Sequence, residues 1–453
     1  MGRTILADKR IGEVIDSFGA VETWAIGLVI GQRTEAKDHA VHLVRTPILD
    51  DGGGDLTKSK KIEHVDEQWV AVHCKQVLRM LPGGLTVIGI FAIAPPENMK
   101  CAQNKLPQVL AAVHKTVRLW ASQTLAVDDV NEGVVLQICS LSKKLTCRTF
   151  DLADSKSGAR PADWKVQNIP ESWITLETTM AFNVDFAVPR EKMSSIMLKQ
   201  IQNGLSPSFQ NLRNAVATID SSFVEDDTLM ETYFAGGATK KKGKKQQQQQ
   251  TQEKMKLNVE LYTTLSSNKD VKPPITEECG ATMSLRGTMI SRAFVHPKTT
   301  AENAVKAIKQ DIMRSIQSRI EIVCEDLLQT EEEQDEHILY EMPVRVFCEL
   351  SGSTLSFGDY MLQDEGVDDS LERFRDIAGL SDANDESLET GLERVPTEEE
   401  LFEDPKKSDP LLGKSFERES SPQTKAKGFL GLVAGGVVAA LAAGISFMYI
   451  GQE

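Results

Sequence analysis

A run of 22 residues near the end of the chain, Phe429–Ile450, contains no charged residue and no amide side chain. A helix of this length measures about 30 Å, which is the thickness of the hydrocarbon core of a bilayer. Helices buried in the core of a globular protein rarely contain an apolar run as long as this one. The sequence therefore predicts a single transmembrane helix.

The residues around this span predict its orientation. Lys425 and Lys427 precede it and Glu453 follows it, and positive charge favours the cytosolic side of a membrane. We therefore expect a tail anchor, inserted after synthesis, that leaves residues 1–428 in the cytosol. Its moderate length and its Gly and Ala content suit the thin membrane of the endoplasmic reticulum.

Small residues recur every four positions along the span and predict a face that packs closely against another helix. The alternative is that Gly and Ala are simply common in such helices. The residues assigned to the membrane anchor are Phe429, Gly431, Gly435, Ala439, Ala443 and Ile450.

The remaining chain has the composition of folded domains joined by polar segments. Its 453 residues, of which 41% are hydrophobic, suffice for two or three domains. A net charge of -15 argues against nucleic-acid binding, because phosphate contacts require clustered Lys and Arg. Residues 361–420 hold 19 acidic and 7 basic residues, so we expect residues 361–428 to form an acidic flexible linker.

Residues 1–190 are predicted to form an α+β domain. Residues 85–94 read as its buried central strand, because the run is short, apolar and rich in β-branched side chains. The other expected elements are strands at 24–31, 40–46, 134–140, 144–152 and 173–188, and amphipathic helices at 65–81 and 101–123.

A second α+β block is expected over residues 256–360. Between the two blocks, residues 191–255 are expected to hold a helix and a disordered Lys/Gln-rich loop, since Lys240–Gln250 has no apolar side chain to bury. The second block should contain strands near 256–265, 281–295 and 343–350 and a long helix at 301–328.

No motif in the chain predicts catalysis or a cofactor. The seven cysteines are scattered without a CxxC pair or a nearby His at zinc-ligand spacing, and there is no phosphate-binding glycine loop. Buried structural cysteines are the favoured interpretation, and a hydrolase with an unrecognised Cys site is the alternative. We expect no metal and no cofactor.

The order of hairpin, helix, buried strand and helix resembles the MPN fold of metal-dependent isopeptidases. In that family the strand ends in Gly-x-x-His-x-His-Pro, whereas this chain has Gly89–Pro95 with Ala92 and Ala94 at the two His positions. Lys105 stands roughly where the family has a metal-binding Asp. A catalytic zinc needs three protein ligands, so the resemblance implies a non-catalytic, MPN-like pseudoenzyme.

Over nearly its full length the chain resembles the family of the odorant-response-abnormal protein of the fourth complementation group. The segments that carry this resemblance are Met1–Thr4, Arg79–Leu85, Cys147–Asp151, Ala159–Lys165, Glu325–Leu328, Arg345–Phe347 and Leu441–Phe447. A structural signature is expected at Arg160, Pro161, Asp163 and Trp164. We expect Trp164 to fix the loop 159–165 onto the first domain, with direct contact to a partner as the alternative.

The resemblance implies a non-catalytic adaptor in the membrane of the endoplasmic reticulum. Family members pair with a ubiquitin-fold-modifier-specific cysteine protease and bring it to the membrane, which is a role in UFMylation. The family is also linked to delivery of odorant G-protein-coupled receptors. We therefore expect the protease as partner, with a chaperone or trafficking factor for such receptors as the alternative.

Overall fold

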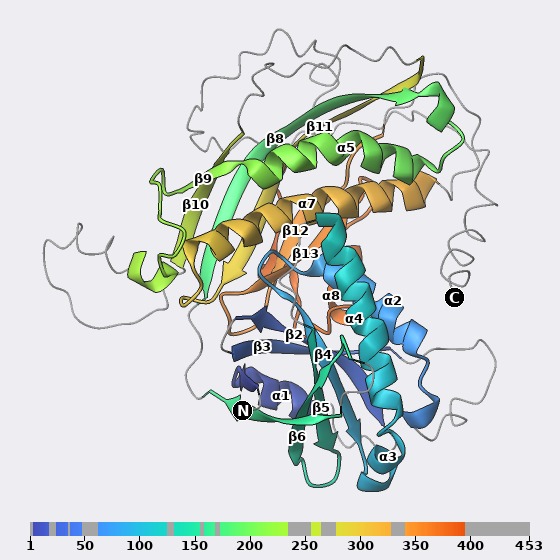
Figure 1. Cartoon of the computed structure of the whole chain (residues 1–453), viewed down its shortest axis with the longest axis vertical. Helices are drawn as coiled ribbons and strands as arrows, with labels where there is room; N and C mark the ends of the chain where they lie inside the picture. The colour runs from blue at the N-terminus through green and yellow to red at the C-terminus, as the bar shows by residue number, and fades with distance from the viewer. Residues whose placement is uncertain are drawn as a thin grey trace, which may run out of the picture.

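The computed structural model of the chain describes residues 3–17, 24–34, 37–47, 62–124, 131–154, 158–167, 173–233, 255–263, 278–327 and 340–394. The expected anchor Phe429–Ile450 and the tract Lys240–Gln250 lie outside these ranges. Within them, no helix is both long and apolar enough to span a bilayer. The fold is mixed α/β, with one sheet unit above the other in Figure 1 and a long helix between them.

The lower unit is a closed barrel with the strand order β1-β3-β2-β4-β5-β6-β7, in which β7 returns to pair with β1. Closure leaves this sheet without a free edge. Its strands are β1 (Thr4–Ala7), β2 (Ala25–Arg33), β3 (Lys37–Arg45), β4 (Thr86–Ala94), β5 (Glu132–Cys139), β6 (Leu145–Asp151) and β7 (Arg160–Val166).

An apolar core fills the inside of the barrel with side chains from all of its strands. Ile5, Leu43, Phe91 and Leu136 are almost completely buried there, and helix α1 (Arg10–Ser17) adds Ile11. Trp164 of β7 is partly buried and packs against the same core. The barrel interior is therefore packed with side chains from its own strands and α1.

Two helices pack on the outer face of β4, and the second of them also contacts β5. Helix α2 (Glu67–Met80) begins at Asp66, whose carboxylate accepts a hydrogen bond from the backbone N–H of Gln68, and it ends just before Pro82. Helix α4 (Lys105–Thr124) packs against it, and the short α3 (Pro96–Cys101) precedes α4. The predicted order of strands and helices in this region is confirmed.

The upper unit is built on two long antiparallel strands, β8 (Ile174–Pro189) and β11 (Cys279–Val295). The strands β10 (Met255–Tyr262) and β9 (Val216–Ile219) extend the sheet on the side of β8, in the order β11-β8-β10-β9. Helices α5 (Met197–Asn214) and α7 (Ala301–Leu327) pack on one face of this sheet (Figure 1).

A third sheet, with the order β13-β12-β14, joins the two units. Phe357 of β13 and both Leu371 and Phe374 of α8 belong to the same apolar core as Leu28 and Val44 on the outside of the barrel. The elements of this part are β12 (Val344–Glu349), β13 (Ser356–Met361), α8 (Val367–Asp376) and β14 (Leu388–Glu389).

Three expectations about organisation are wrong. The first domain does not extend to residue 190, because β8 pairs with β11 along its whole length and belongs to the upper sheet. The acidic linker does not begin at residue 361, since the apolar face of α8 packs on the barrel despite the acidic composition around it. The expected loop 159–165 lies almost entirely in strand β7, and the pairing of β7 with β1 closes the barrel.

Candidate functional site

The positions where the MPN-like resemblance expects metal ligands lie under the helices that cover the barrel. Ala92 and Ala94, on β4, are both fully buried, and Ala92 packs in the core shared with α2 and α4. Methyl groups have no lone pair to donate to a metal. No group of three His, Cys, Asp or Glu side chains that could hold a metal ion occurs within the ranges that the structure describes.

Lys105 lies at the start of α4 and forms an ion pair with Glu67 at the start of α2. The hydrogen bond from the Lys105 ammonium group lowers the pKa of the Glu67 carboxyl group, because it stabilises the charged form. This pair links the first turns of two packed helices. Lys105 therefore has a structural contact that does not depend on a metal.

The cysteine thiols differ in the direction of their pKa shifts. Burial raises the pKa of Cys147 and of Cys324 to about 12, so both thiols remain protonated at neutral pH. Cys139, which is partly buried, has a lowered pKa, because Ser142 hydrogen-bonds to its sulfur. All of these thiols are free of disulfides.

The most strongly organised polar site is a buried ion pair between Asp311 of α7 and Arg345 of β12. Both side chains are at most 1% exposed, and the guanidinium group donates two hydrogen bonds, of 2.6 and 3.0 Å, to the two carboxylate oxygens. The same carboxylate accepts the backbone N–H groups of Gly83 and Arg292, each at 2.9 Å. One carboxylate thus ties together the loop before β4, strand β11, helix α7 and strand β12.

Gly83 has to be glycine for this junction to close. A Cβ atom there would stand 2.2 Å from the carbonyl oxygen of Ala307 on α7. Although burial disfavours the charged guanidinium group, the Asp311 carboxylate raises the pKa of Arg345 above its ordinary value. The Arg345 guanidinium group therefore remains charged in the folded protein.

Several segments that carry the family resemblance meet around this junction. Arg79, just before Gly83, donates a 2.6 Å hydrogen bond to Glu325 near the end of α7. The ring of Phe347 lies under the guanidinium groups of Arg345 and Arg292, at 4.8 and 4.3 Å from its centroid. The segments 79–85, 325–327 and 345–347 are thus neighbours in space, and they hold the two units together.

The last described residues form a strap over this junction. After β14, the carboxylate of Glu393 is only 3% exposed and accepts hydrogen bonds of 2.8 and 2.6 Å from Arg319 of α7. It also accepts the backbone N–H groups of Ile290 on β11 and Arg345 on β12, each at 2.8 Å. The chain from Leu388 to Arg394 is therefore fixed to the centre of the molecule.

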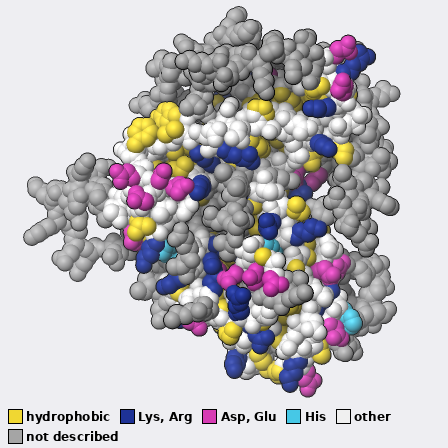
Figure 2. Space-filling view, in the orientation of Figure 1, with side chains coloured by type: hydrophobic (Ala, Val, Ile, Leu, Met, Phe, Trp, Pro, Cys, Tyr) yellow, Lys and Arg dark blue, Asp and Glu magenta, His cyan; other side chains and the backbone are white. Residues whose placement is uncertain are grey.

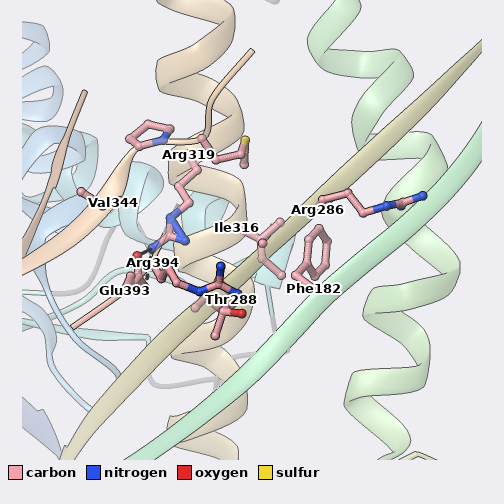
Figure 3. Close-up of a pocket in the computed structure, with 12 residues that line it drawn as sticks. Phe182, Arg286, Thr288, Ile316, Arg319, Val344, Glu393 and Arg394 are labelled. Atoms are coloured by element: carbon pink, nitrogen blue, oxygen red, sulfur yellow. Dashed lines mark hydrogen bonds and ion pairs between the residues drawn. The ribbon is translucent and has the colours of Figure 1, made fainter. Parts of the chain in front are cut away.

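A small pocket opens beside this strap, at the edge of β11 (Figure 3). Phe182 and Ile316 provide apolar surface, and Arg319 and Glu393 lie at its inner end. The lining residues are Phe182, Arg286, Gly287, Thr288, Met289, Ile316, Arg319, Met342, Pro343, Val344, Glu393 and Arg394.

The expected signature of residues 160–165 forms part of the barrel wall. Trp164 pairs in register with Ile5 and packs against the inner core, as a structural residue would. The guanidinium nitrogens of Arg160 lie 3.7 Å from a carboxylate oxygen of Glu132 and 4.0 Å from one of Asp151. A carboxylate oxygen of Asp163 lies 3.6 Å from the Lys165 ammonium nitrogen. Pro161 pairs in register with Arg148. These positions explain how β7 bridges β6 and β1, while a role in partner binding stays a prediction.

Apolar side chains also reach the surface of the upper unit. Val216 and Tyr262, which are partners in register on β9 and β10, are each about half exposed, and Phe223 is 78% exposed. On the face shown in Figure 2, hydrophobic side chains gather at the upper left and a group of acidic side chains lies below them. The upper unit therefore carries exposed apolar side chains around β9 and β10.

Sequence reasoning missed the junction around Asp311. The helix at 301–328 was predicted from its apolar face, and its opposite face, with polar Asp311, Ser315 and Ser318, looks like a surface exposed to water. All three side chains are fully buried. Small residues at Ala304, Ala307, Ser315 and Ser318 were the available signal, because they allow close approach of other backbone segments.

Comparison with known proteins identifies relatives along almost the whole chain. The family model described as "ODR4-like: Odorant response abnormal 4-like" matches residues 27–388. The proteins named "Protein odr-4 homolog" from Mus musculus and Homo sapiens are each 32% identical, over 99% of this chain and 99% of theirs. The Drosophila melanogaster protein of the same name is 20% identical over 87% of this chain.

Among solved structures, the crystal structure of UfSP from C. elegans aligns with 83% of this chain and 56% of its own. Its TM-score is 0.42 and the aligned sequences are 8% identical, a similarity too low to establish a shared fold. The family match covers most of the barrel and the upper sheet and ends at Leu388, and the relatives at 32% identity also cover the strap. On these two findings, the chain belongs to the ODR4-like family.

Proposed function

We propose that this protein is a non-catalytic adaptor that binds the ubiquitin-fold-modifier-specific cysteine protease and holds it at the membrane of the endoplasmic reticulum. Membership of the ODR4-like family supports the proposal, because the resemblance in the sequence implies that role. The observation that carries the non-catalytic part is the filling of the expected metal positions. Ala92 and Ala94 are both fully buried, Ala92 within the apolar core under the helices, and Lys105 is bound to Glu67.

In this proposal each part of the molecule has a separate task. The closed barrel and the junction around Asp311 provide a rigid body, and the exposed surface of that body binds the protease. The span Phe429–Ile450, which lies outside the described residues, provides the membrane anchor. A standard protein interface buries about 1,600 Å² in total, which a body of this size can supply.

The test is a co-purification in which the membrane anchor is removed. A chain ended at residue 394 retains α8 and the strap, whereas an end near residue 360 would remove the apolar side chains of Leu371 and Phe374 from the core. The shortened chain should bind the protease without membranes, and a chain with an unrelated endoplasmic reticulum anchor should restore the protease to the membrane in cells. Failure of either result would refute the adaptor mechanism.

The non-catalytic part has its own test. Purified protein should contain no zinc at stoichiometric amount and should not cleave modifier conjugates, because Ala92 and Ala94 offer no ligand atoms. Chelator-removable zinc at one equivalent would contradict this part of the proposal while leaving protease binding untouched.

A second function, delivery of G-protein-coupled receptors, is favoured by one feature of the sequence. Gly431, Gly435, Ala439 and Ala443 recur every four residues along the expected span, and such residues let transmembrane helices approach closely. If the span recognises receptors, then replacing it with an unrelated anchor should abolish receptor delivery but leave protease binding intact. Unchanged receptor delivery with the foreign anchor would remove this second function from the span.

A further inference from the structure

Strand β11 has an outer edge that is covered near its C-terminal end and open further back. The backbone N–H group of Phe294 donates to Gly83, that of Arg292 donates to Asp311, and that of Ile290 donates to Glu393. All three groups point away from β8, because alternate residues of a strand present their hydrogen-bonding groups to opposite sides. Each of these covered positions is an even-numbered residue.

The same alternation continues toward the start of the strand. The register with β8 has no shift between Ala281 and Val295, so the N–H and C=O groups of the preceding even-numbered residues also point outward. These residues are Thr282, Ser284, Arg286 and Thr288. Among the described residues, none of their backbone groups has a backbone partner outside the β8–β11 pair.

An open edge of this length is unusual, because it is a template for pairing with another extended chain. The lower unit avoids the problem by closing into a barrel. In the upper unit, the carboxylate of Glu393 in the strap accepts the outward N–H group of Ile290 and so covers the edge at that residue. From Thr288 back to Thr282 the described chain supplies no hydrogen-bonding partner to this edge. The outward backbone N–H and C=O groups of four residues could therefore pair with a further strand.

The pocket lies directly beside this edge and defines what the added strand should carry. Gly287, Thr288 and Met289 of β11 line it together with Phe182, Ile316 and Val344, which offer apolar contact. Of the arginines that line the pocket, Arg286 lies 2.8 Å from a carboxylate oxygen of Asp185 and Arg319 is bound to Glu393. The apolar part of the lining therefore fits an apolar side chain.

We propose that residues Thr282–Thr288 of β11 bind an extended segment of the protease by β-strand addition, with an apolar residue of that segment in the adjacent pocket. Backbone hydrogen bonds would supply affinity, and the pocket would supply selectivity. The inference deepens the proposed function, since it gives the adaptor a mode of binding for the protease.

The test uses proline substitutions in the full-length chain in detergent, with the protease as ligand. Thr288→Pro removes one outward N–H group and blocks a neighbouring strand, whereas Thr288→Ala changes the side chain and keeps that group. Thr288→Pro should weaken binding at least about tenfold, a loss equivalent to about one net hydrogen bond. Thr288→Ala should stay within about twofold of the unchanged protein, as its backbone is unaltered.

A second pair of variants and a measurement without mutations guard against misfolding. Ser284→Pro and Ser284→Ala both lose the side-chain hydrogen bond to Asp185, so only the backbone group distinguishes them. In the unmodified protein, hydrogen exchange at Thr282, Ser284, Arg286 and Thr288 should slow when the protease binds.

The outcomes separate this inference from the proposed function. Protease binding that is unaffected by both prolines, with no added protection at the edge, would overturn strand addition and leave the adaptor role in place. Edge amides that are already protected in the free chain would show that the chain covers its own edge, which also overturns the inference. Absence of any protease binding by the unmodified chain would reject the proposed function, and the inference with it.

Discussion

The barrel and the upper sheet solve the same problem of sheet edges in opposite ways. In the barrel, β7 pairs with β1, and the interior is filled by apolar side chains such as Phe91. In the upper sheet, β8 and β11 run far beyond the four residues of β8 that β10 covers. On this stretch the side chains are half-buried on one face and largely exposed on the other. The barrel therefore pairs the edges of its strands with one another, and the upper sheet keeps hydrogen-bonding groups available.

The two regions also differ in how much charge they bury. The barrel buries Asp38 in an ion pair with Arg3, whereas the junction between the units buries two ion pairs, Asp311 with Arg345 and Arg319 with Glu393. A buried ion pair adds little net stability compared with apolar packing, but removing one partner is costly. The junction thus fixes the geometry of the two units.

The largest effect should come from breaking the junction. Asp311→Ala leaves the Arg345 guanidinium group and two backbone N–H groups buried without their acceptor. We expect the free energy of unfolding to fall by about 3–5 kcal/mol. Urea denaturation measures this, with Glu302→Ala as control, because its exposed pair with Lys306 should contribute less than about 0.5 kcal/mol.

A matched pair of aromatic substitutions compares the two cores directly. Phe91→Ala leaves a cavity in the closed barrel and should cost about 3–5 kcal/mol. Phe182→Ala, on the half-exposed stretch of β8, should cost about 1–2 kcal/mol, because less area returns to water. Equal losses in thermal denaturation would contradict the view that the barrel is the more tightly packed unit.

Acid should weaken the attachment of α8 to the barrel. Burial lowers the pKa of His42 to about 4, and its Nε2 atom lies 3.1 Å from the carbonyl oxygen of Ala378. Between pH 6.5 and 4 the unfolded chain binds a proton that the folded chain does not, so stability falls as the pH falls. The full loss is about 3 kcal/mol. Denaturation of His42→Gln across this range should show a correspondingly smaller dependence on pH.

A smaller effect than that at the junction is expected at the strap. Glu393→Ala removes the acceptor of Arg319 and of two backbone N–H groups, but the strap can move away and let water reach them. We expect a loss of about 2 kcal/mol and faster hydrogen exchange at Ile290. Glu398→Ala, in the residues that follow, is the control. Unchanged exchange at Ile290 would mean that the strap does not protect this edge.

The sequence predicts the individual elements better than their partners. The run at residues 85–94 is β4, and the helices at 65–81 and 301–328 are α2 and α7 within one to three residues. These elements follow from local apolar periodicity. The pairing of β8 with β11 depends on residues about 100 positions apart, which no local pattern contains.

The candidate site follows the same division. Ala92, Ala94 and Lys105 were expected from a motif, and the structure places all three at the covered side of the barrel, with Lys105 on Glu67. Asp311 and Glu393 were not expected, because a charged residue in an acidic or amphipathic segment is ordinarily exposed to water. Only the tertiary structure brings each of them to an arginine and to unpaired N–H groups.

Helix α7 is shared by both units, and this has a calorimetric consequence. Ile308 packs in the core of the upper sheet, while Asp311, one turn further on, binds the loop that leads into β4 of the barrel. Neither unit can melt without exposing one side of the same helix. A heating scan of the described body should therefore show one heat-absorption peak, with calorimetric and van't Hoff enthalpies in a ratio of about one. Two resolved peaks would mean that α7 transmits no cooperativity between the units.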